Sequence, residues 1–279
     1  MKRLLLPTDF SACAEKALQY AVTIAQQAGA ELILVHACDL LVNRFEDRKA
    51  IIAEYNLTTT TALNSKLVAL KNRIEDQDKV PVTIKLYDGD ITDSILEAAD
   101  KYKPDLIVMG TTGASGIKKL LLGSHAADVI SKSSIPVLTV PAHYEGFALK
   151  EMLLAINNPE EKSEKLKVFF ELARLFKAHV RLMVVTYNRE DAATYIEDHR
   201  HITYIQGKLQ NQYGEQNLAV EHLSGTNFQD TVQDFIDKNN IDIIGMITRK
   251  REALQRYFNK SATKAWAYQT TIPLLSLPQ

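Results

Sequence analysis

The sequence contains few cysteines, and their scarcity excludes two kinds of protein. Cys13 and Cys38 are the only two in 279 residues, and neither lies in a C-x-x-C pair or in a cysteine–histidine spacing typical of zinc sites. A disulfide-stabilised scaffold and a structural zinc site are therefore not supported, and no metal-binding residue is assigned. Isolated thiols suit a reducing compartment, so we expect a cytoplasmic protein.

Long apolar runs and an excess of one charge are missing as well. No stretch approaches the roughly 18 apolar residues of a membrane-spanning helix, and the apolar run in the N-terminal MKRLLLPTDFS is too short for a signal peptide. The 33 basic and 34 acidic residues leave a net charge of −1, so no overall field attracts nucleic acid. We expect neither a membrane nor a nucleic acid as a partner.

Glycine is scarce too, with 11 residues in the chain, yet four of them fall between Gly110 and Gly123. They follow the apolar run DLIVMG and precede a helical pattern that begins near Ser124. Glycine permits positive φ and leaves room for a ligand, and the first N–H groups of a helix attract phosphate. The segment is predicted to hold a phosphate-bearing ligand, and turn formation alone is an equally good interpretation.

The chain contains an internal repeat. SSIPVLTVP at Ser133–Pro141 returns as TTIPLLSLP at Thr270–Pro278, and DLIVMG returns as DIIGMI at the same offset of 137 in the numbering. Near the front, RLLLPTD returns as EMLLAIN at the larger offset of 148, so the second copy is shorter in its middle. We therefore expect two tandem domains of one kind, residues 1–143 and 150–279.

Each copy alternates strand and helix patterns. In the first copy, Ser11 is expected to cap a helix that ends at Gly29, the apolar Glu31–Ala37 is expected to form a strand, and a polar helix spans roughly residues 43–76. Continuous apolar strands separated by helices indicate a parallel sheet covered on both faces. The predicted fold class is α/β, with two doubly wound domains whose ligands bind beyond the carboxyl ends of the strands.

Gly110-x2-Gly113-x9-Gly123-Ser124 is similar to the G-2x-G-9x-G-S/T signature of the universal stress proteins. PTDFS, VMGTTG and the SSIPVLTVP segment resemble the same family. The resemblance covers the chain as two tandem domains, strongly in residues 1–142 and in outline in 150–279. It implies a five-stranded parallel sheet of order 3-2-1-4-5 in each domain, and an ATP site, with or without Mg²⁺, in members that keep the signature.

The resemblance also implies which residues meet the nucleotide. The loop that meets the adenosine matches Pro7, Thr8 and Asp9, and a position whose backbone contacts adenine matches Ala37. The segment that holds the ribose and phosphates matches Gly110, Gly113, Gly123, Ser124 and His125. His125 departs from the small apolar residue often found there. We expect its imidazole to point into solvent, and the alternative is an additional hydrogen-bond donor.

The second copy has lost this signature. At the offset of 137 the three glycines become Ile247, Lys250 and Lys260, and at the offset of 148 the strand-end aspartate becomes Asn157. Side chains then occupy the space that a phosphate needs, so we expect nucleotide binding in the first domain alone. The basic run Thr248–Glu252 is interpreted as a solvated surface.

Two further residues carry reactive groups without partners nearby in the sequence. Cys13 has no neighbouring histidine or lysine that would activate it, so we expect a buried structural thiol. His36 lies within a strand pattern, and we expect a structural histidine in the core or at the end of that strand. No second carboxylate or base accompanies Asp9, so no catalytic residue is assigned.

The resemblance also implies how the two domains meet and what they do. Many single-domain members dimerise through the last strand, which implies an intrachain pseudo-dimer through Ile135–Pro141 and Ile272–Pro278 and removes two exposed sheet edges. The leading hypothesis is a cytoplasmic stress-response protein that binds ATP in its first domain and has a regulatory or signalling role. The alternatives are a slow ATPase or nucleotidyl transferase, and a nucleotide-free scaffold for a protein or a lipid-like ligand. The protein partner is not identifiable from the sequence.

Overall fold

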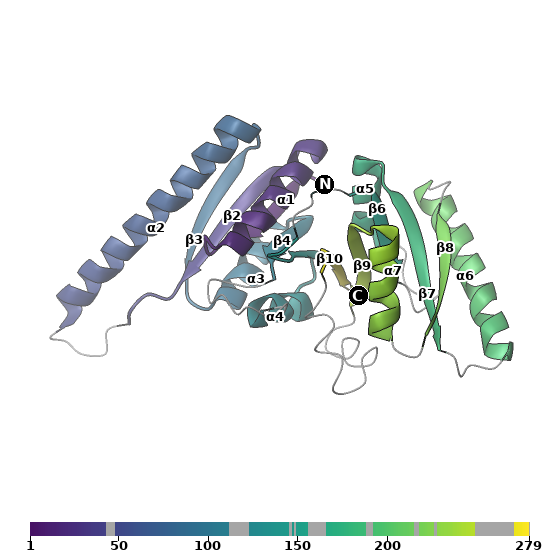
Figure 1. Cartoon of the computed structure of the whole chain (residues 1–279). Coiled ribbons are helices and arrows are strands. Elements are labelled where there is room, and N and C mark those ends of the chain that lie inside the picture. Colours follow the sequence, from purple (N-terminus) through teal and green to yellow (C-terminus); the bar gives the residue numbers. More distant parts are fainter. Residues whose placement is uncertain are drawn as a thin grey trace. The chain divides into compact units, whose positions relative to one another are not determined.

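The computed structural model describes residues 1–42, 48–111, 123–144, 147, 149–155, 166–187, 192–214, 218–225, 228–248 and 271–278. These residues form two compact units, which meet along the chain between Ala142 and His143. Each unit is a parallel sheet with helices packed on it (Figure 1), so the predicted α/β fold class is confirmed.

The first unit alternates strands and helices throughout. Its elements are β1 (Arg3–Pro7), α1 (Ala12–Ala28), β2 (Glu31–Cys38), α2 (Lys49–Asp78), β3 (Val82–Asp88), α3 (Ile91–Tyr102), β4 (Leu106–Gly110), α4 (Ser124–Lys132) and β5 (Val137–Val140). The strand order is β3-β2-β1-β4-β5 and the strands pair in parallel, as the resemblance implied. Helices α1 and α2 contact each other and the sheet, as do α3 and α4, so the two pairs cover opposite faces (Figure 1).

Local signals explain where these elements begin and end. The Ser11 side chain accepts the Ala14 N–H at 3.2 Å and caps α1, which ends at Gly29 in the left-handed conformation with φ 62°. The central strands are buried without interruption, as in Leu4–Leu6 and Leu106–Met109, because helices cover both faces of the sheet. Each such side chain contributes about 1.5–3 kcal/mol by its burial.

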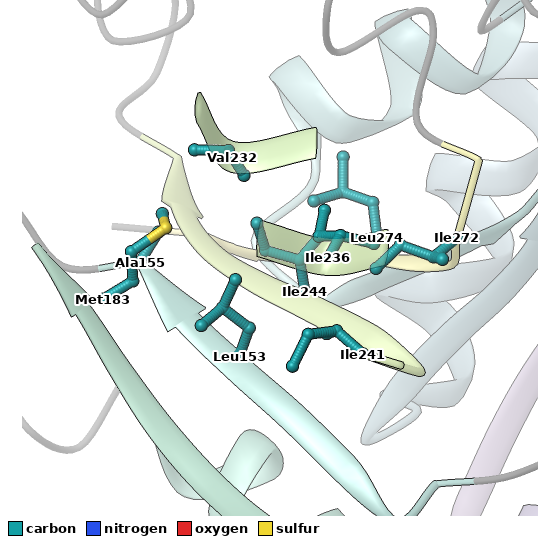
Figure 2. Packing of buried hydrophobic residues seen from close by; sticks show 9 residues of the cluster. All are labelled: Leu153, Ala155, Met183, Val232, Ile236, Ile241, Ile244, Ile272 and Leu274. Atoms are coloured by element: carbon teal, nitrogen blue, oxygen red, sulfur yellow. The ribbon is translucent and has the colours of Figure 1, made fainter. Parts of the chain in front are cut away.

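The second unit repeats this plan. Its elements are β6 (Glu151–Ala155), α5 (Lys167–Phe176), β7 (His179–Tyr187), α6 (Ala192–Tyr213), β8 (Ala219–Gly225), α7 (Phe228–Asn239), β9 (Ile243–Thr248) and β10 (Leu274–Pro278). The strand order is β8-β7-β6-β9-β10, again parallel. Figure 2 shows part of the core, where side chains of β6, β7, β9 and β10 pack with those of α7.

The shortening of the second copy lies in one place. The starts of β1 and β6, and likewise those of β2 and β7, are related by the offset of 148. The starts of β8, β9 and β10 follow those of β3, β4 and β5 at the offset of 137. The residues missing from the second copy therefore lie between β7 and β8, where α6 has 22 residues and its counterpart α2 has 30. It shortens a peripheral helix and its connections, so the sheet itself is preserved.

One carboxylate contact recurs in both units. Asp105 Oδ2 accepts the N–H groups of Lys2 and Arg3, the latter at 3.0 Å, and so joins the start of β1 to the segment before β4. In the second unit, Asp242 Oδ2 accepts the N–H groups that lead into β6, at 2.7 and 3.0 Å. These aspartates occupy equivalent positions, so the repeat retains a structural contact while it loses the glycine signature.

Candidate functional site

The strand order places the carboxyl ends of β1 and β4 side by side. The order reverses between these neighbouring strands, because the chain moves outward from β1 through β2 to β3 and then returns to β4. Leu5 pairs with Ile107, and continuing that register brings Thr8 level with Gly110. Loops at such a reversal diverge to opposite faces of the sheet and leave a crevice in which doubly wound proteins bind ligands.

The loop after β1 is held by its own polar groups. The Thr8 N–H donates to the Val35 carbonyl at 2.8 Å, which extends the pairing with β2 beyond Pro7. Thr8 Oγ1 accepts the Phe10 N–H at 3.1 Å, and Asp9 Oδ1 accepts the Ser11 N–H at 3.0 Å. These short-range bonds form the turn, in which Phe10 adopts the left-handed conformation with φ 61°. The Asp9 carboxylate is therefore oriented before any ligand arrives.

His36 supports the same loop from β2. Its Nδ1 lies 2.6 Å from the Thr8 carbonyl oxygen, so a protonated Nδ1 donates to that carbonyl. The Phe10 ring packs on the imidazole with 4.9 Å between ring centroids, and Lys66 Nζ of α2 lies 5.6 Å from the Phe10 centroid. The expected strand-end role of His36 is confirmed. Phe10 and Lys66 were missed, since nothing in the local sequence links a lysine of α2 to this loop.

Ala37 lies at the end of β2, next to the loop after β1. It is half-buried and pairs with Tyr87 of β3, so its backbone is fixed by the sheet. The adjacent Cys38 thiol donates to the Tyr87 carbonyl at 3.5 Å. Burial raises the pKa of Cys38, and the carboxylates of Asp88 and Asp39 raise it further. The thiol is consequently protonated at neutral pH and unsuited to act as a nucleophile.

Gly110 ends β4 for a reason that the sequence did not reveal. A Cβ atom at this position would lie 2.6 Å from Cys13 Sγ and 3.0 Å from the Cys13 carbonyl oxygen. The glycine therefore lets α1 approach the sheet. Cys13 is buried, with its Sγ 3.6 Å from the Val140 carbonyl oxygen, as expected for a structural thiol.

A positive φ does not explain why glycine occurs at Gly110 and Gly123, the two signature positions that the structure describes. Among the described glycines, positive φ occurs at Gly29, Gly89 and Gly214, and Gly123 has φ −61°. The positive φ that glycine permits is therefore not used at Gly110 or Gly123. Gly113 lies outside the described residues.

Helix α4 begins at Ser124, as predicted, and Gly123 is its N-cap residue. The Gly123 N–H donates to the Thr111 carbonyl and closes the loop at its base, while the Gly123 carbonyl accepts the Ala127 N–H at 3.0 Å. No side chain of the described residues caps this helix start. The N–H groups of the first turn and the exposed Ser124 hydroxyl are thus suited to an anion.

His125 follows in the first turn of α4, and its ring does not simply point into solvent. Its Nδ1 lies 3.2 Å from Oγ1 of Thr92, a residue of α3 that is only 3% exposed. Asp90 caps α3 by accepting the Asp93 N–H at 3.0 Å. This hydrogen bond lowers the pKa of Asp90, and the Thr92 N–H and the positive charges of His125 and Lys132 add to the effect. The imidazole thus links two helix N-termini.

The corresponding position of the second unit differs. Ile247 of β9 stands where Gly110 ends β4, and it is half-buried. Lys250, Lys260, Asn157 and most of Thr248–Glu252 lie outside the described residues, so Ile247 alone carries the structural comparison. A branched side chain at the strand end cannot reproduce the close approach that Gly110 allows.

Other site classes find no support in the described part of the chain. No three histidine, cysteine, aspartate or glutamate side chains of the described residues gather as metal ligands would. No helix within the described ranges is both long and apolar enough to cross a bilayer.

Comparisons with known proteins agree on one family. A sequence model of the universal stress protein family matches residues 1–141. A universal stress protein of Methanocaldococcus jannaschii is 33% identical over 141 residues, which cover 50% of this chain and 81% of the relative. A solved universal stress protein from Archaeoglobus fulgidus has a TM-score of 0.73 at 18% identity, over 99% of this chain and 98% of that one. Another, solved in complex with cAMP, is 26% identical over 50% of this chain and 97% of its own, with a TM-score of 0.36.

Proposed function

Because this chain belongs to the universal stress protein family, we propose that it is a cytoplasmic stress-response protein whose first unit binds ATP in a regulatory role. The observation that supports this proposal most strongly is that the carboxyl ends of β1 and β4 are neighbours at the point where the strand order reverses. A preorganised Thr8–Asp9 turn ends β1, and the signature residues Gly123 and Ser124 open α4 beside it. One loop offers a carboxylate and the other offers N–H donors, which suits a ligand that has hydroxyl groups at one end and phosphates at the other.

Each described residue has a distinct task in this proposal. The Asp9 carboxylate, which the Ser11 N–H orients, accepts hydrogen bonds from ribose hydroxyl groups. The fixed backbone of Ala37 meets the adenine edge. The Ser124 hydroxyl and the first N–H groups of α4 bind phosphate oxygens. Gly110 acts indirectly, because it sets the position of α1 against β4.

The proposal names ATP within the wider class of adenine nucleotides. The relative solved with cAMP binds a member of that class. A regulatory role is favoured over dedicated catalysis, because Asp9 has a structural partner and the Cys38 thiol is protonated at neutral pH. Binding without turnover makes the nucleotide a signal that changes the population of protein states.

A matched pair of loop variants tests ATP binding. Gly113→Val changes a signature glycine, whereas Gly116→Ala changes a glycine of the same loop outside the signature. Isothermal titration with ATP should show an affinity at least about tenfold weaker for Gly113→Val, equivalent to ~1.4 kcal/mol, and a nearly unchanged affinity for Gly116→Ala. Equal affinities in all three proteins, or no binding by the wild type at millimolar ATP, would overturn the proposal.

Two further arms of this experiment separate the alternatives. Titrations with ADP and cAMP, and with ATP in the presence or absence of Mg²⁺, identify the preferred nucleotide and the need for the ion. Phosphate release above the protein-free background, abolished by Asp9→Ala, would replace the regulatory role by a slow ATPase.

We also propose that the second unit serves as an internal partner of the first. Strands β5 and β10 are each the last strand of their own unit in the order given above, and the edge of a sheet is a surface that promotes association. Pairing through Ile135–Pro141 and Ile272–Pro278 would satisfy both edges within one chain. The isolated residues 1–143 should then dimerise in light-scattering measurements under conditions in which the whole chain is monomeric. A monomeric 1–143 fragment that folds and stays soluble would contradict this pairing.

A further inference from the structure

Helix α2 exposes an apolar face that differs from an ordinary solvent-covered helix surface. Between Ala50 and Leu70 the helix has two charged residues, whereas its last part, from Lys71 to Asp78, has five. The large apolar side chains exposed on the first part are Ile51, Tyr55, Leu57 and Val68. Helix surfaces that face solvent are normally charged or polar, and exposed apolar patches mark interaction sites. The first part of α2 is therefore a candidate docking surface.

Six exposed, uncharged residues form a continuous line on this surface, which we call the α2 seam. They are spaced alternately four and three residues apart, as in the a and d positions of a coiled coil. The members are Ile51, Tyr55, Thr58, Ala62, Ser65 and Ala69. Ile51 and Tyr55 are 69% and 55% exposed. The buried Leu67 lies on the other side of the helix, toward the sheet, so the seam faces outward.

The helix that carries the seam is fixed at two points. Near its start, Asn56 Oδ1 accepts the Leu41 N–H at 3.0 Å, and Asn56 Nδ2 donates to the Leu41 carbonyl at 2.9 Å. Further along, Arg73 Nη2 donates to the Glu15 carboxylate of α1 at 2.8 Å. Figure 1 shows α2 as one unbroken helix alongside β3. The seam is therefore presented in one orientation, and a partner need not order it.

The seam is complementary to itself in size. Each larger residue of its first half has a smaller counterpart equally far beyond position 60. The pairs are Ile51 with Ala69, Tyr55 with Ser65, and Thr58 with Ala62. In two antiparallel copies related by a two-fold axis at position 60, the members of each pair face one another. Large residues then meet small ones, which fills the interface and lets the helices approach closely.

The charges of this part of α2 favour the same arrangement. Glu54 and Lys66 are the charged residues between Ala50 and Leu70, and they too are equally far from position 60. An antiparallel pair places each of them level with the opposite charge of the partner helix. A parallel pair would place glutamate level with glutamate and lysine level with lysine, which is unfavourable. The charge pattern therefore selects the antiparallel pair.

The polar side chains of the seam region can be buried at low cost. The Ser65 hydroxyl donates to the Thr61 carbonyl at 2.9 Å, and the Thr61 hydroxyl donates to the Leu57 carbonyl at 2.7 Å. Because these donors already have partners within the helix, covering them leaves no hydroxyl donor unsatisfied.

From these observations we propose that the α2 seam binds the α2 seam of a second copy of the chain, as an antiparallel helix pair centred on position 60. A strip about 27 Å long and roughly 10 Å wide on each helix buries less than the ~1,200 Å² of a standard interface. The dimer is therefore weak, with a Kd of roughly 10–100 µM. It is separate from the edge pairing proposed above, because α2 packs on β2 and β3, away from β5 in the strand order.

The test introduces the same substitution at two positions of α2 in the whole chain. Ala62→Glu places two like charges close together at the centre of the pair. Ala53→Glu is the matched control, because Ala53 is exposed and lies on the side of α2 opposite the seam. In sedimentation velocity between about 10 and 500 µM, which brackets the expected Kd, wild type and Ala53→Glu should shift equally toward dimer. Ala62→Glu should dimerise at least about tenfold more weakly, with an unchanged circular dichroism spectrum.

Cysteine cross-linking tests the orientation of the pair. Tyr55→Cys and Ser65→Cys are made separately in a chain with Cys38→Ala, since Cys13 is buried. Under mild oxidation the mixture of the two proteins should form disulfide-linked dimers that contain one chain of each. Dimers formed within either single variant, and none that contain both chains, would contradict the antiparallel pair.

Two further outcomes overturn the proposal. One is a wild-type chain that stays monomeric throughout the concentration range, or an Ala62→Glu protein that dimerises as wild type does. The other is binding of a monomeric wild type to phosphatidylcholine vesicles that Ala62→Glu abolishes, which would assign the seam to a lipid surface. Neither outcome bears on nucleotide binding by the first unit, which the ATP titrations measure independently.

Discussion

Replacing Gly110 by alanine tests whether this signature glycine is required by packing. The added Cβ would lie 2.6 Å from Cys13 Sγ, and 3.0 and 3.1 Å from the carbonyl oxygen and carbon of Cys13. Real Cβ atoms essentially never approach another atom as closely as 2.6 Å, and the two backbone contacts are tighter than most real ones, so the thiol must move and α1 must shift slightly on the sheet. Two of the three close atoms belong to the α1 backbone, and rotation of the thiol alone therefore cannot relieve the clash.

The expected cost follows from the kind of contact involved. Overpacking of a close-packed core costs about 1–3 kcal/mol, and for a unit of this size each kcal/mol lowers the melting temperature by roughly 4 °C. Cys13→Ala in the same chain removes the contact at 2.6 Å but leaves the backbone contacts. The double variant should therefore recover about half of the loss, and the double-mutant cycle measures the coupling between the two side chains.

Scanning calorimetry provides the assay, fitted with separate transitions for the two units because a two-domain chain need not unfold in one step. Hydrogen exchange read by mass spectrometry should locate the loss of protection in α1 and β4. Gly207→Ala is the matched control. No atom lies within 4 Å of a Cβ at Gly207 in α6, so the exchange should be neutral or stabilise the helix by up to ~1 kcal/mol. A Gly110→Ala protein as stable as wild type would refute the packing explanation.

The remaining predictions concern charged groups. Asp105→Asn and Asp242→Asn should each destabilise their own unit by about 1–2 kcal/mol in urea unfolding, because a charged acceptor shared by two N–H groups becomes neutral; unchanged midpoints would contradict this. Partial burial would raise the pKa of Glu151, but hydrogen bonds and charges from His179 and Arg181 outweigh it and lower the pKa. This stabilisation is therefore complete above the ordinary glutamate pKa of ~4.3 and is lost as the pH falls through the lowered value. Glu151→Gln should weaken the dependence of the second unit's stability on pH at acid pH. An unaltered pH dependence would contradict this role of Glu151.

The general plan of the molecule was predictable because its signals are local or repeated. A continuous apolar strand such as Leu4–Leu6 shows its burial directly, since a strand covered on both faces needs no polar alternation. The Ser11 cap and the Gly29 terminus of α1 follow from neighbouring residues alone. The repeat offset aligned β4 with β9 and β5 with β10 without any structure, because both copies must build the same sheet.

The candidate site was predictable only in part. The start of α4 at Ser124 depends on local chemistry and was predicted from the sequence, whereas the loop at Asp9 was implied by the family resemblance. The support that His36 gives to Thr8 links residues 28 apart, and the Thr92–His125 contact links residues 33 apart. Contacts of this kind depend on which helix packs on which face, and a single sequence holds no local trace of that choice.

Gly110 shows most clearly which properties follow from the sequence and which follow only from the tertiary structure. The sequence by itself determined that a glycine-rich segment follows a buried strand and leads into a helix, since spacing and composition are local properties. Only the tertiary structure decided that this glycine faces Cys13, far earlier in the chain, and not a left-handed turn. The physical reason is that backbone hydrogen bonds and apolar periodicity act between near neighbours, whereas close packing acts between surfaces that meet only when α1 lies on β4.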